Sequence, residues 1–138
     1  WSGLIGGTLG GVLVGYTQLN LGDSFIESIT GDIPENLWGE RPFVIFFLLS
    51  FGALFGDMSA SFFKRRSNLK RGDKSPILDM FDFVGMALIL TLLFGNGWLQ
   101  SWLFDGMGPL FTILLLTPIL HRGVNIIGFK IGVKNEPW

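Results

Sequence analysis

The chain contains no cysteine, one histidine (His121) and one tyrosine among its 138 residues. Without cysteine it can form no disulfide, no thiolate nucleophile and no sulfur-ligated zinc site. A single histidine also excludes a metal site built from several imidazoles. Any metal chemistry must therefore use oxygen ligands, which favours magnesium, calcium or manganese.

Charge is scarce as well, with 15% charged residues against 49% hydrophobic residues and a mean hydropathy of +0.50. Residues 1–22 and 83–104 carry no charge, and 42–56 and 106–120 are shorter uncharged runs. A membrane-spanning helix needs about 20 mainly apolar residues. The sequence therefore predicts a single all-α integral membrane domain, a bundle with four spans at about 1–21, 42–63, 77–94 and 103–120.

The charged segments predict the orientation of these spans. Residues 22–41 hold five acidic residues and only one cation, whereas residues 64–76 hold six cations and only one acid. Under the positive-inside rule, the basic loop 64–76 and the tail 121–138 lie in the cytoplasm of a multi-pass protein of the cell membrane. No basic segment precedes the first apolar run, so no signal peptide is visible. The chain is expected to be the downstream part of a longer protein with a fifth, earlier span.

Glycines recur every four residues in the first span, at Gly3, Gly7, Gly11 and Gly15. This spacing places them on one helical face, which allows either tight helix packing or room for a substrate against the helix. In the fourth span, Pro118 is expected to bend the helix near its cytoplasmic end.

Three aspartates lie in or beside the expected membrane spans, where the surroundings are mostly hydrocarbon. Asp57 lies six residues before the end of the second span, where an ionised side chain is costly and usually marks a functional site. Ser61 and Lys64 follow at i+4 and i+7 on the same helix face. Asp79 and Asp82 are i,i+3 neighbours at the start of the third span. These groups predict a polar, cytoplasm-facing cavity at the inner edge of the bilayer.

Three carboxylates beside a cluster of cations suit a nucleoside triphosphate with Mg²⁺. Carboxylates hold the metal, the metal bridges phosphate oxygens, and Lys or Arg neutralises the remaining charge. Such transfer reactions need positioning and charge stabilisation more than a protein nucleophile. The chain offers no Ser–His or Cys–His pair, and this chemistry requires none.

Each feature also has a plainer interpretation. The basic loop can simply hold anionic lipid headgroups. Asp79 and Asp82 can favour a helix N-terminus through its dipole, and Asp57 can pair with Arg122 or a loop lysine. His121 and Arg122 are interpreted as residues that snorkel to the membrane interface, not as ligands.

The stretch 56–83, GDMSASFFKRRSNLKRGDKSPILDMFDF, resembles the signature of the CTP-dependent phosphatidate cytidylyltransferases. That signature runs Gly-Asp, Ser, Lys-Arg, a later Lys, a Pro and finally Asp-x-x-Asp. It is matched at Gly56, Asp57, Ser61, Lys64, Arg65, Lys70, Pro76, Asp79 and Asp82. The chain lacks the Gly-His-Gly-Gly segment of the bacterial and eukaryotic members. This shortening and the tail HRGVNIIGFKIGVKNEPW resemble the archaeal branch, the CDP-archaeol synthases.

The resemblance implies transfer of a cytidylyl group from CTP to an isoprenoid ether-linked glycerol phosphate, with release of pyrophosphate. CTP, this lipid phosphate and membrane lipids are the implied partners, and no nucleic acid is implied. The resemblance implies that Mg²⁺ is held by Asp57, Asp79 and Asp82. These three aspartates and Lys64 would be the catalytic residues. The nucleotide would be bound by Ser61, Lys64, Arg65 and Lys70.

Two alternatives come from other classes of protein, and a third is a different membrane enzyme. A small transporter would use Asp57 in a conduction path, but the other spans carry almost nothing ionisable. A non-enzymatic subunit would bind lipid headgroups with the basic loop, which gives no reason for three converging carboxylates. A CDP-alcohol phosphotransferase would need glycine after its first aspartate pair and a second pair later, whereas Phe83 follows Asp82 and no such pair comes after it.

Overall fold

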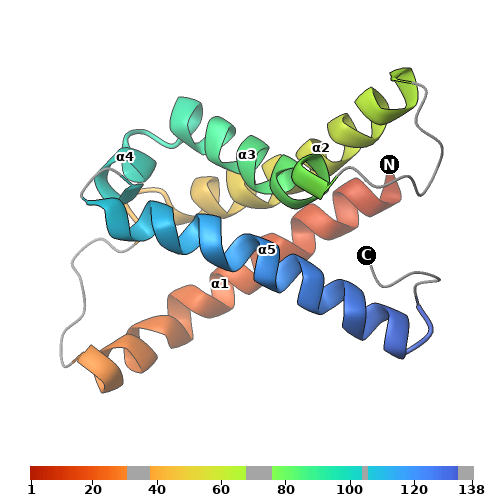
Figure 1. The fold of residues 1–138 in the computed structure, drawn as a ribbon. Coiled ribbons are helices and arrows are strands. Elements are labelled where there is room, and N and C mark those ends of the chain that lie inside the picture. The colour runs from red at the N-terminus through yellow and green to blue at the C-terminus, as the bar shows by residue number, and fades with distance from the viewer. Residues whose placement is uncertain (31–37, 68–75, 104–105, 134–138) are drawn as a thin grey trace.

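The computed structural model describes residues 1–30, 38–67, 76–103 and 106–133 (Figure 1). These residues form five helices and no strand, which confirms the all-helical prediction. The helices are α1 (Ser2–Thr30), α2 (Pro42–Arg66), α3 (Pro76–Phe94), the short α4 (Trp98–Leu103) and α5 (Met107–Lys130).

The expected spans lie within or close to these helices, but three boundaries differ. α1 continues beyond residue 21 to Thr30, and a short helix, α4, forms at residues 98–103, between the expected third and fourth spans and at the first residue of the fourth. α5 passes through Pro118 and continues to Lys130, so residues 121–130 of the expected cytoplasmic tail are helical. Proline removes only one helical hydrogen-bond donor, so the turns after it can keep their own bonds. In α5 the helix therefore extends beyond the end of its apolar run.

Among the described residues, two helices are long and apolar enough to cross a membrane: α2, with a mean hydropathy of 1.9, and Gly108–Lys130 of α5, with 1.6. Phe81–Phe94 of α3 is a shorter apolar stretch. Only 33% and 11% of the apolar windows in α2 and α5 are buried inside the protein. Exposing so much apolar surface to water is unfavourable, so these two helices are suited to the hydrocarbon of a membrane. The total of four spans stays a prediction.

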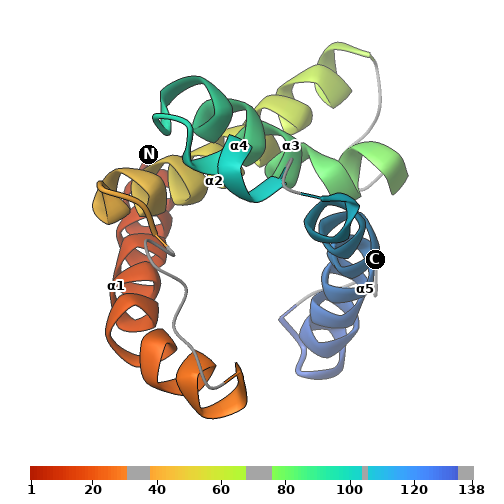
Figure 2. The same ribbon diagram turned by 90° about the vertical axis from the view of Figure 1, so that its left-hand side faces the viewer.

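The helices form an open row in which α1 packs on α2, α2 on α3, and α3 on both α4 and α5. In the described parts of the chain, α1 and α5 make no contact with each other. Figure 2 shows these two helices extending from the α2–α3 layer with open space between them. The start of α1, the end of α2, the start of α3 and the end of α5 lie toward one end of the molecule (Figure 1).

Glycines set the close approach of α1 to α2. A Cβ added at Gly7, Gly11 or Gly15 would run into an α2 side chain, whereas one at Gly3 would meet nothing within 4 Å. The α2 residues met are Leu54, Ser50 and Phe46, respectively. Three of the four glycines in the stripe therefore serve helix packing, as one of the two interpretations predicted.

Alanine at Gly11 is expected to destabilise the protein relative to alanine at Gly10. Both changes gain the same helix propensity, but only the Gly11 methyl group overlaps Ser50, whose hydroxyl donates a 2.7 Å hydrogen bond to the Phe46 carbonyl. Overpacking of this kind costs about 1–3 kcal/mol. Thermal unfolding in detergent measures the difference, and equal Tm values for Gly10→Ala and Gly11→Ala would contradict it.

Candidate functional site

The last turns of α2 carry the first group of predicted site residues. Asp57 and Arg65 are exposed, and Ser61 and Lys64 are half-buried. The helix ends after Arg66, where the Ser67 N–H donates to the Phe63 carbonyl at 3.0 Å. Lys64, Arg65 and Arg66 all lie in this last turn, where cations favour the negative end of the helix dipole.

The first turns of α3 carry the second group. Pro76 opens the helix, as proline can at a helix start, where its missing N–H is not needed. Asp82 is half-buried, and its Oδ1 accepts a 2.6 Å hydrogen bond from the backbone N–H of Phe83, which orients the carboxylate. Asp79 lies one turn earlier in α3, but its side chain is outside the described residues, and so is Lys70.

Two glycines of α2 bring these groups together. A Cβ added at Gly52 would lie 2.7 Å from the Cα of Ala87, and one at Gly56 would overlap the backbone carbonyl of Asp82. The backbones of α2 and α3 are therefore almost in contact, as small residues spaced by four allow. Because Asp57 directly follows Gly56, this crossing places the Asp57 and Asp82 carboxylates near each other.

Electrostatic interactions also link these groups. Asp82 is acted on by the charge of Asp57, which is unfavourable, and by the charges of Lys64 and His121, which are favourable. Two carboxylates and a lysine from two helices thus share one region, joined by a histidine from a third helix. Like charges held together by helix packing repel each other, so this region is suited to bind a cation.

His121 reaches this region from α5. Its imidazole stacks on Phe83, with ring centroids 6.1 Å apart and an interplanar angle of 27°. Its Nε2 lies 3.5 Å from Nδ2 of Asn125, which is 5% exposed. The interpretation of His121 as an interfacial residue missed this placement. Its signal in the sequence is the spacing of Thr117, His121 and Asn125, one helical turn apart on an otherwise apolar helix.

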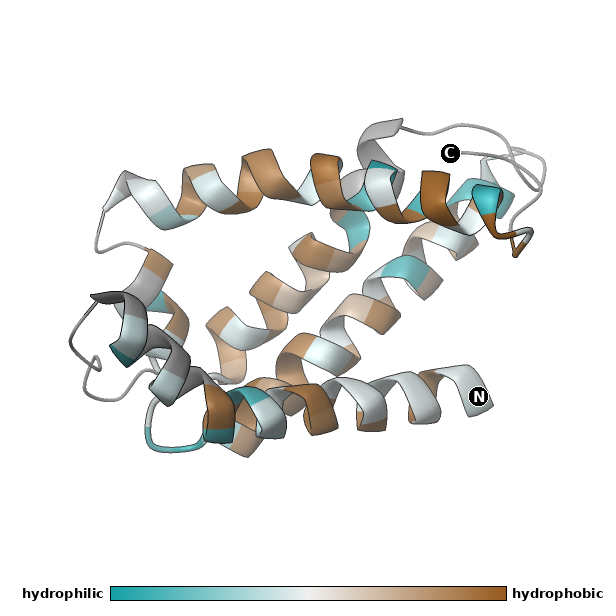
Figure 3. Ribbon diagram, turned by 90° about the horizontal axis from the view of Figure 1, so that it is seen from below, coloured by the Kyte–Doolittle hydropathy of each residue, from teal (hydrophilic) through white to brown (hydrophobic). Residues whose placement is uncertain are grey.

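Figure 3 shows this distribution of polarity. Apolar residues colour most of the helices, with separate hydrophilic positions between them. α3 packs on both α2 and α5, so the helices that carry Asp57 and His121 each contact the helix that carries Asp82.

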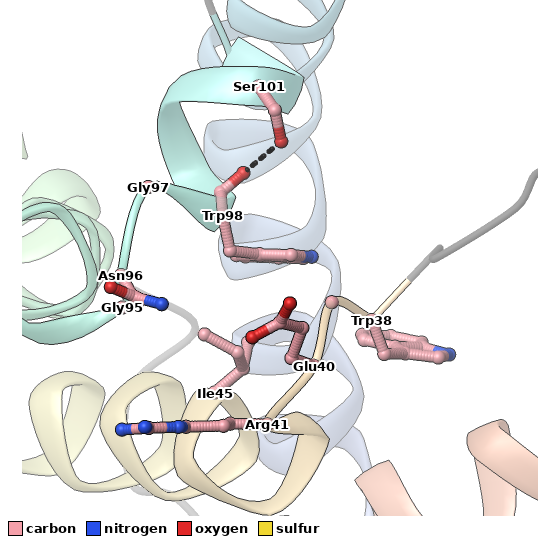
Figure 4. Close-up of a pocket in the computed structure, with 10 residues that line it drawn as sticks. Trp38, Glu40, Arg41, Ile45, Gly95, Asn96, Gly97, Trp98 and Ser101 are labelled. Atoms are coloured by element: carbon pink, nitrogen blue, oxygen red, sulfur yellow. Dashed lines mark hydrogen bonds between the residues drawn. The ribbon is translucent and has the colours of Figure 1, made fainter.

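A pocket of about 370 Å³ lies at the other end of α2 (Figure 4). The rings of Trp38 and Trp98 stack there at 6.3 Å, and Glu40 points between Trp98 and Arg41. Arg41 and Asp57 are separated by 16 residues of one helix, or about 24 Å along its axis. This pocket cannot include the aspartates, and a polar cavity around Asp57 and Asp82 stays a prediction.

The family model described as CarS-like, CDP-archaeol synthase, matches residues 1–138. The chain belongs to the CDP-archaeol synthase family. It is 41% identical over 136 residues to the CDP-archaeol synthase of Methanospirillum hungatei, covering 99% of this chain and 76% of that protein. It is 40% identical over 138 residues to the CDP-archaeol synthase of Methanoregula boonei, covering 100% of this chain and 77% of the relative. No solved structure matches the chain.

A relative from a different genus gives the same result. The CDP-archaeol synthase of Picrophilus torridus is 39% identical over 138 residues, covering 99% of this chain and 72% of that protein. These matches confirm the resemblance seen in the stretch 56–83.

For a CDP-archaeol synthase family member, the fit of a metal to these residues can be judged from their donor atoms. Among the side chains that the structure describes, no three histidine, aspartate or glutamate residues form a cluster that could hold a metal ion. Asp57 and Asp82 nevertheless supply oxygen donors on two facing helices. Mg²⁺ is commonly bound by one or two carboxylates together with substrate phosphates. The two carboxylates therefore fit Mg²⁺ that arrives with a nucleotide.

Proposed function

We propose that this protein transfers a cytidylyl group from CTP to an isoprenoid ether-linked glycerol phosphate, forming a CDP-lipid (CDP-archaeol) and pyrophosphate for phospholipid synthesis. Membership of the CDP-archaeol synthase family supports the reaction. The observation in the structure that carries it is the crossing of α2 and α3 at Gly56, which brings Asp57, Asp82 and Lys64 into one region.

In this reaction a phosphate oxygen of the lipid attacks the α-phosphorus of CTP. A new P–O bond forms while the bond from the α-phosphorus to the oxygen bridging to the β-phosphorus breaks. Pyrophosphate leaves with the electron pair of that bond. No protein nucleophile is needed, so catalysis depends on positioning and on stabilising negative charge.

Different side chains are proposed to bind the metal ion, to neutralise phosphate charge and to donate hydrogen bonds. Asp57 and Asp82, with Asp79 from the same helix as Asp82, would hold Mg²⁺, which when bound supplies positive charge to the phosphates. Lys64 and Arg65 offset the phosphate charge that remains, since cations near the end of α2 can reach anionic oxygens. Ser61, one turn after Asp57, donates a hydrogen bond to the nucleotide. Lys70 is proposed to join these nucleotide-binding residues.

The place of the site follows from the two substrates. CTP is soluble in water, whereas the chains of the lipid phosphate stay in hydrocarbon, so a site at the bilayer edge can meet both. The cations at the end of α2 and those in the second half of α5 (Arg122 and Lys130) lie toward the same end of the molecule. Their sign supports a multi-pass membrane protein with this end in the cytoplasm.

The two other classes are less well supported. A transporter is expected to carry ionisable residues along several spans, whereas the described acids and cations of α2 and α3 gather at one end. A headgroup-binding subunit does not need Asp57 and Asp82 beside each other. The CDP-archaeol synthase relatives favour neither class.

Detergent-purified protein given CTP, an isoprenoid glycerol phosphate and Mg²⁺ is expected to release one pyrophosphate for each CDP-lipid formed. Chelation of divalent cations with EDTA is expected to stop the release, because the phosphates and carboxylates then repel each other. Coupled pyrophosphate detection and lipid chromatography measure the two products. Lipid binding that is sensitive to salt but occurs without turnover of CTP would favour a headgroup-binding subunit and refute the enzyme.

A further inference from the structure

The second half of α5 carries a stripe of polar residues, Thr117, His121 and Asn125, which is called here the α5 polar stripe. Thr117 and Asn125 are only 8% and 5% exposed. Exposed apolar side chains flank the stripe, among them Leu120 and Val124, which are 61% and 66% exposed. Polar side chains that face the interior of an otherwise apolar membrane helix commonly mark a substrate path or a site.

The imidazole of His121 is held at two points. Phe83 of α3 stacks against its ring, and the Asn125 amide lies 3.5 Å from Nε2, at the long end of hydrogen-bonding distance. In the tautomer that carries its proton on Nδ1, Nε2 can accept from the Asn125 amide nitrogen, which only donates. In that tautomer His121 presents an N–H donor on the side of the ring away from Asn125.

That ring belongs to the same region as the acids. His121 interacts electrostatically with Asp82, as Asp57 and Lys64 also do. α5 thus adds a third side to a region whose other two sides are α2 and α3. The two cations assigned to the nucleotide, Lys64 and Arg65, are on α2, whereas His121 is on α5.

The α5 side is also the side that a lipid can reach. Within the described residues α5 contacts only α3 and α4, and no helix covers the flank that faces α1 (Figure 2). Leu115, Ile119 and Leu120 are exposed on the membrane side of His121, so isoprenoid chains can lie on them. A lipid placed in this way carries its phosphate at the level of the α5 polar stripe.

We propose that His121 contacts the lipid substrate, donating a hydrogen bond from Nδ1 to an oxygen of the lipid phosphate while the α2 cations hold CTP. Phe83 and Asn125 position the ring for this contact. The proposal rests on the cytidylyl transfer proposed above and assigns one of its two phosphate-bearing substrates to α5.

Two substitutions separate the hydrogen bond from the stacking. His121→Phe keeps an aromatic ring against Phe83 but has no donor, and is expected to raise KM for the lipid phosphate about 10- to 100-fold, the usual effect of losing a hydrogen bond to a charged group. His121→Asn loses the ring, but its amide nitrogen lies close to the position of Nδ1. It is expected to raise this KM by less than about 5-fold, since the donor is kept. KM for CTP and kcat should change little in both proteins, as for the loss of uniform binding.

The opposite order, with His121→Asn impaired and His121→Phe normal, would show a stacking role and overturn the proposal. A rise in KM for CTP in place of the lipid would assign the contact to the nucleotide and overturn it too. So would unchanged constants in both proteins. Thr112→Val serves as the matched control, since Thr112 is exposed on α5 and its hydroxyl donates to the Gly108 carbonyl of the same helix.

CDP-lipid formation by the wild-type protein shows whether a negative result concerns the role of His121 or the proposed function itself. If the wild-type protein forms no CDP-lipid, the proposed function itself fails. If it does, and His121→Phe has a wild-type KM for the lipid phosphate, only the role of His121 fails. Thermal unfolding of each variant in detergent verifies that it is folded. If both variants are unfolded, Asn125→Leu replaces them, with the same KM pattern expected at about 3- to 10-fold because the ring loses one of its two supports.

Discussion

An Asp82→Asn protein is expected to release pyrophosphate at least ~100-fold more slowly than the wild-type protein, because Mg²⁺ supplies several kcal/mol of charge stabilisation and loses a ligand. The amide has nearly the size of the carboxylate, so the half-buried position and the α2–α3 crossing are kept. The rate is measured with saturating CTP and lipid phosphate in detergent, so that weaker binding does not hide a change in kcat.

The stability of the same protein provides an independent measurement. Burial is the largest influence on the charged Asp82 and opposes it, as the charge of Asp57 also does, so neutralising Asp82 removes costs that exceed the attraction of Lys64 and His121. In the absence of Mg²⁺, the Tm of Asp82→Asn should equal or exceed that of the wild-type protein. A loss of activity without a loss of stability would assign Asp82 to the chemistry and not to the fold.

Asp57→Asn and Asp79→Asn are expected to lower the rate by the same factor. Glu40→Gln is the control, because Glu40 is an exposed acid in the pocket at the other end of α2, and the start of this helix is about 24 Å from Asp57 along its axis. Full activity in any one of the three asparagine variants would remove that residue from the metal site.

The proximity of Asp57 and Asp82 could be predicted from the sequence, but its cause could not. The signature in residues 56–83 and the positive-inside rule put both acids at one boundary of the membrane. What holds them together is the contact of Gly52 and Gly56 with the backbone of α3. A Gly-x-x-x-Gly pair predicts a close helix contact but does not tell which helix is the partner.

The role of the α1 glycines could not be predicted either, because it depends on which helix packs against them. Their spacing allowed either packing or substrate space, and only the position of α2 decides for packing at Gly7, Gly11 and Gly15. The uncharged runs placed α2 and α3 to within a few residues, because proline opens both and charge or glycine follows. The apolar run could not predict that α5 continues to Lys130, because a helix can extend past its apolar segment when its polar side chains find partners.

His121 was missed for a related reason. A histidine followed by arginine at the end of an apolar run is typical of the membrane interface. Only the tertiary structure shows that α5 crosses the start of α3, which brings the ring onto Phe83. Buried Thr117 and Asn125 one turn to either side are the indication that this face of α5 does not point to lipid.

A Gly56→Ala protein is expected to lose about 100-fold in activity and about 1–3 kcal/mol in stability. The added Cβ would overlap the backbone carbonyl of Asp82, which cannot rotate away as a side chain can, so α3 must shift relative to α2. Overpacking a tight contact carries that stability cost, and a misplacement of about 1 Å at a reacting centre can cost about 100-fold in rate. Pyrophosphate release and thermal unfolding in detergent measure the two effects.

Gly52→Ala and Gly85→Ala test whether the crossing positions the acids. Gly85 is on α3 with nothing within 4 Å of an added Cβ, so alanine there should keep both activity and stability. Gly52 contacts Ala87, one turn farther from the acids, so Gly52→Ala should lose stability but less activity than Gly56→Ala. If Gly56→Ala and Gly52→Ala lost activity equally, general packing of α2 on α3 would be sufficient. A larger loss at Gly56 means that the backbone contact beside Asp82 sets the distance between the two carboxylates.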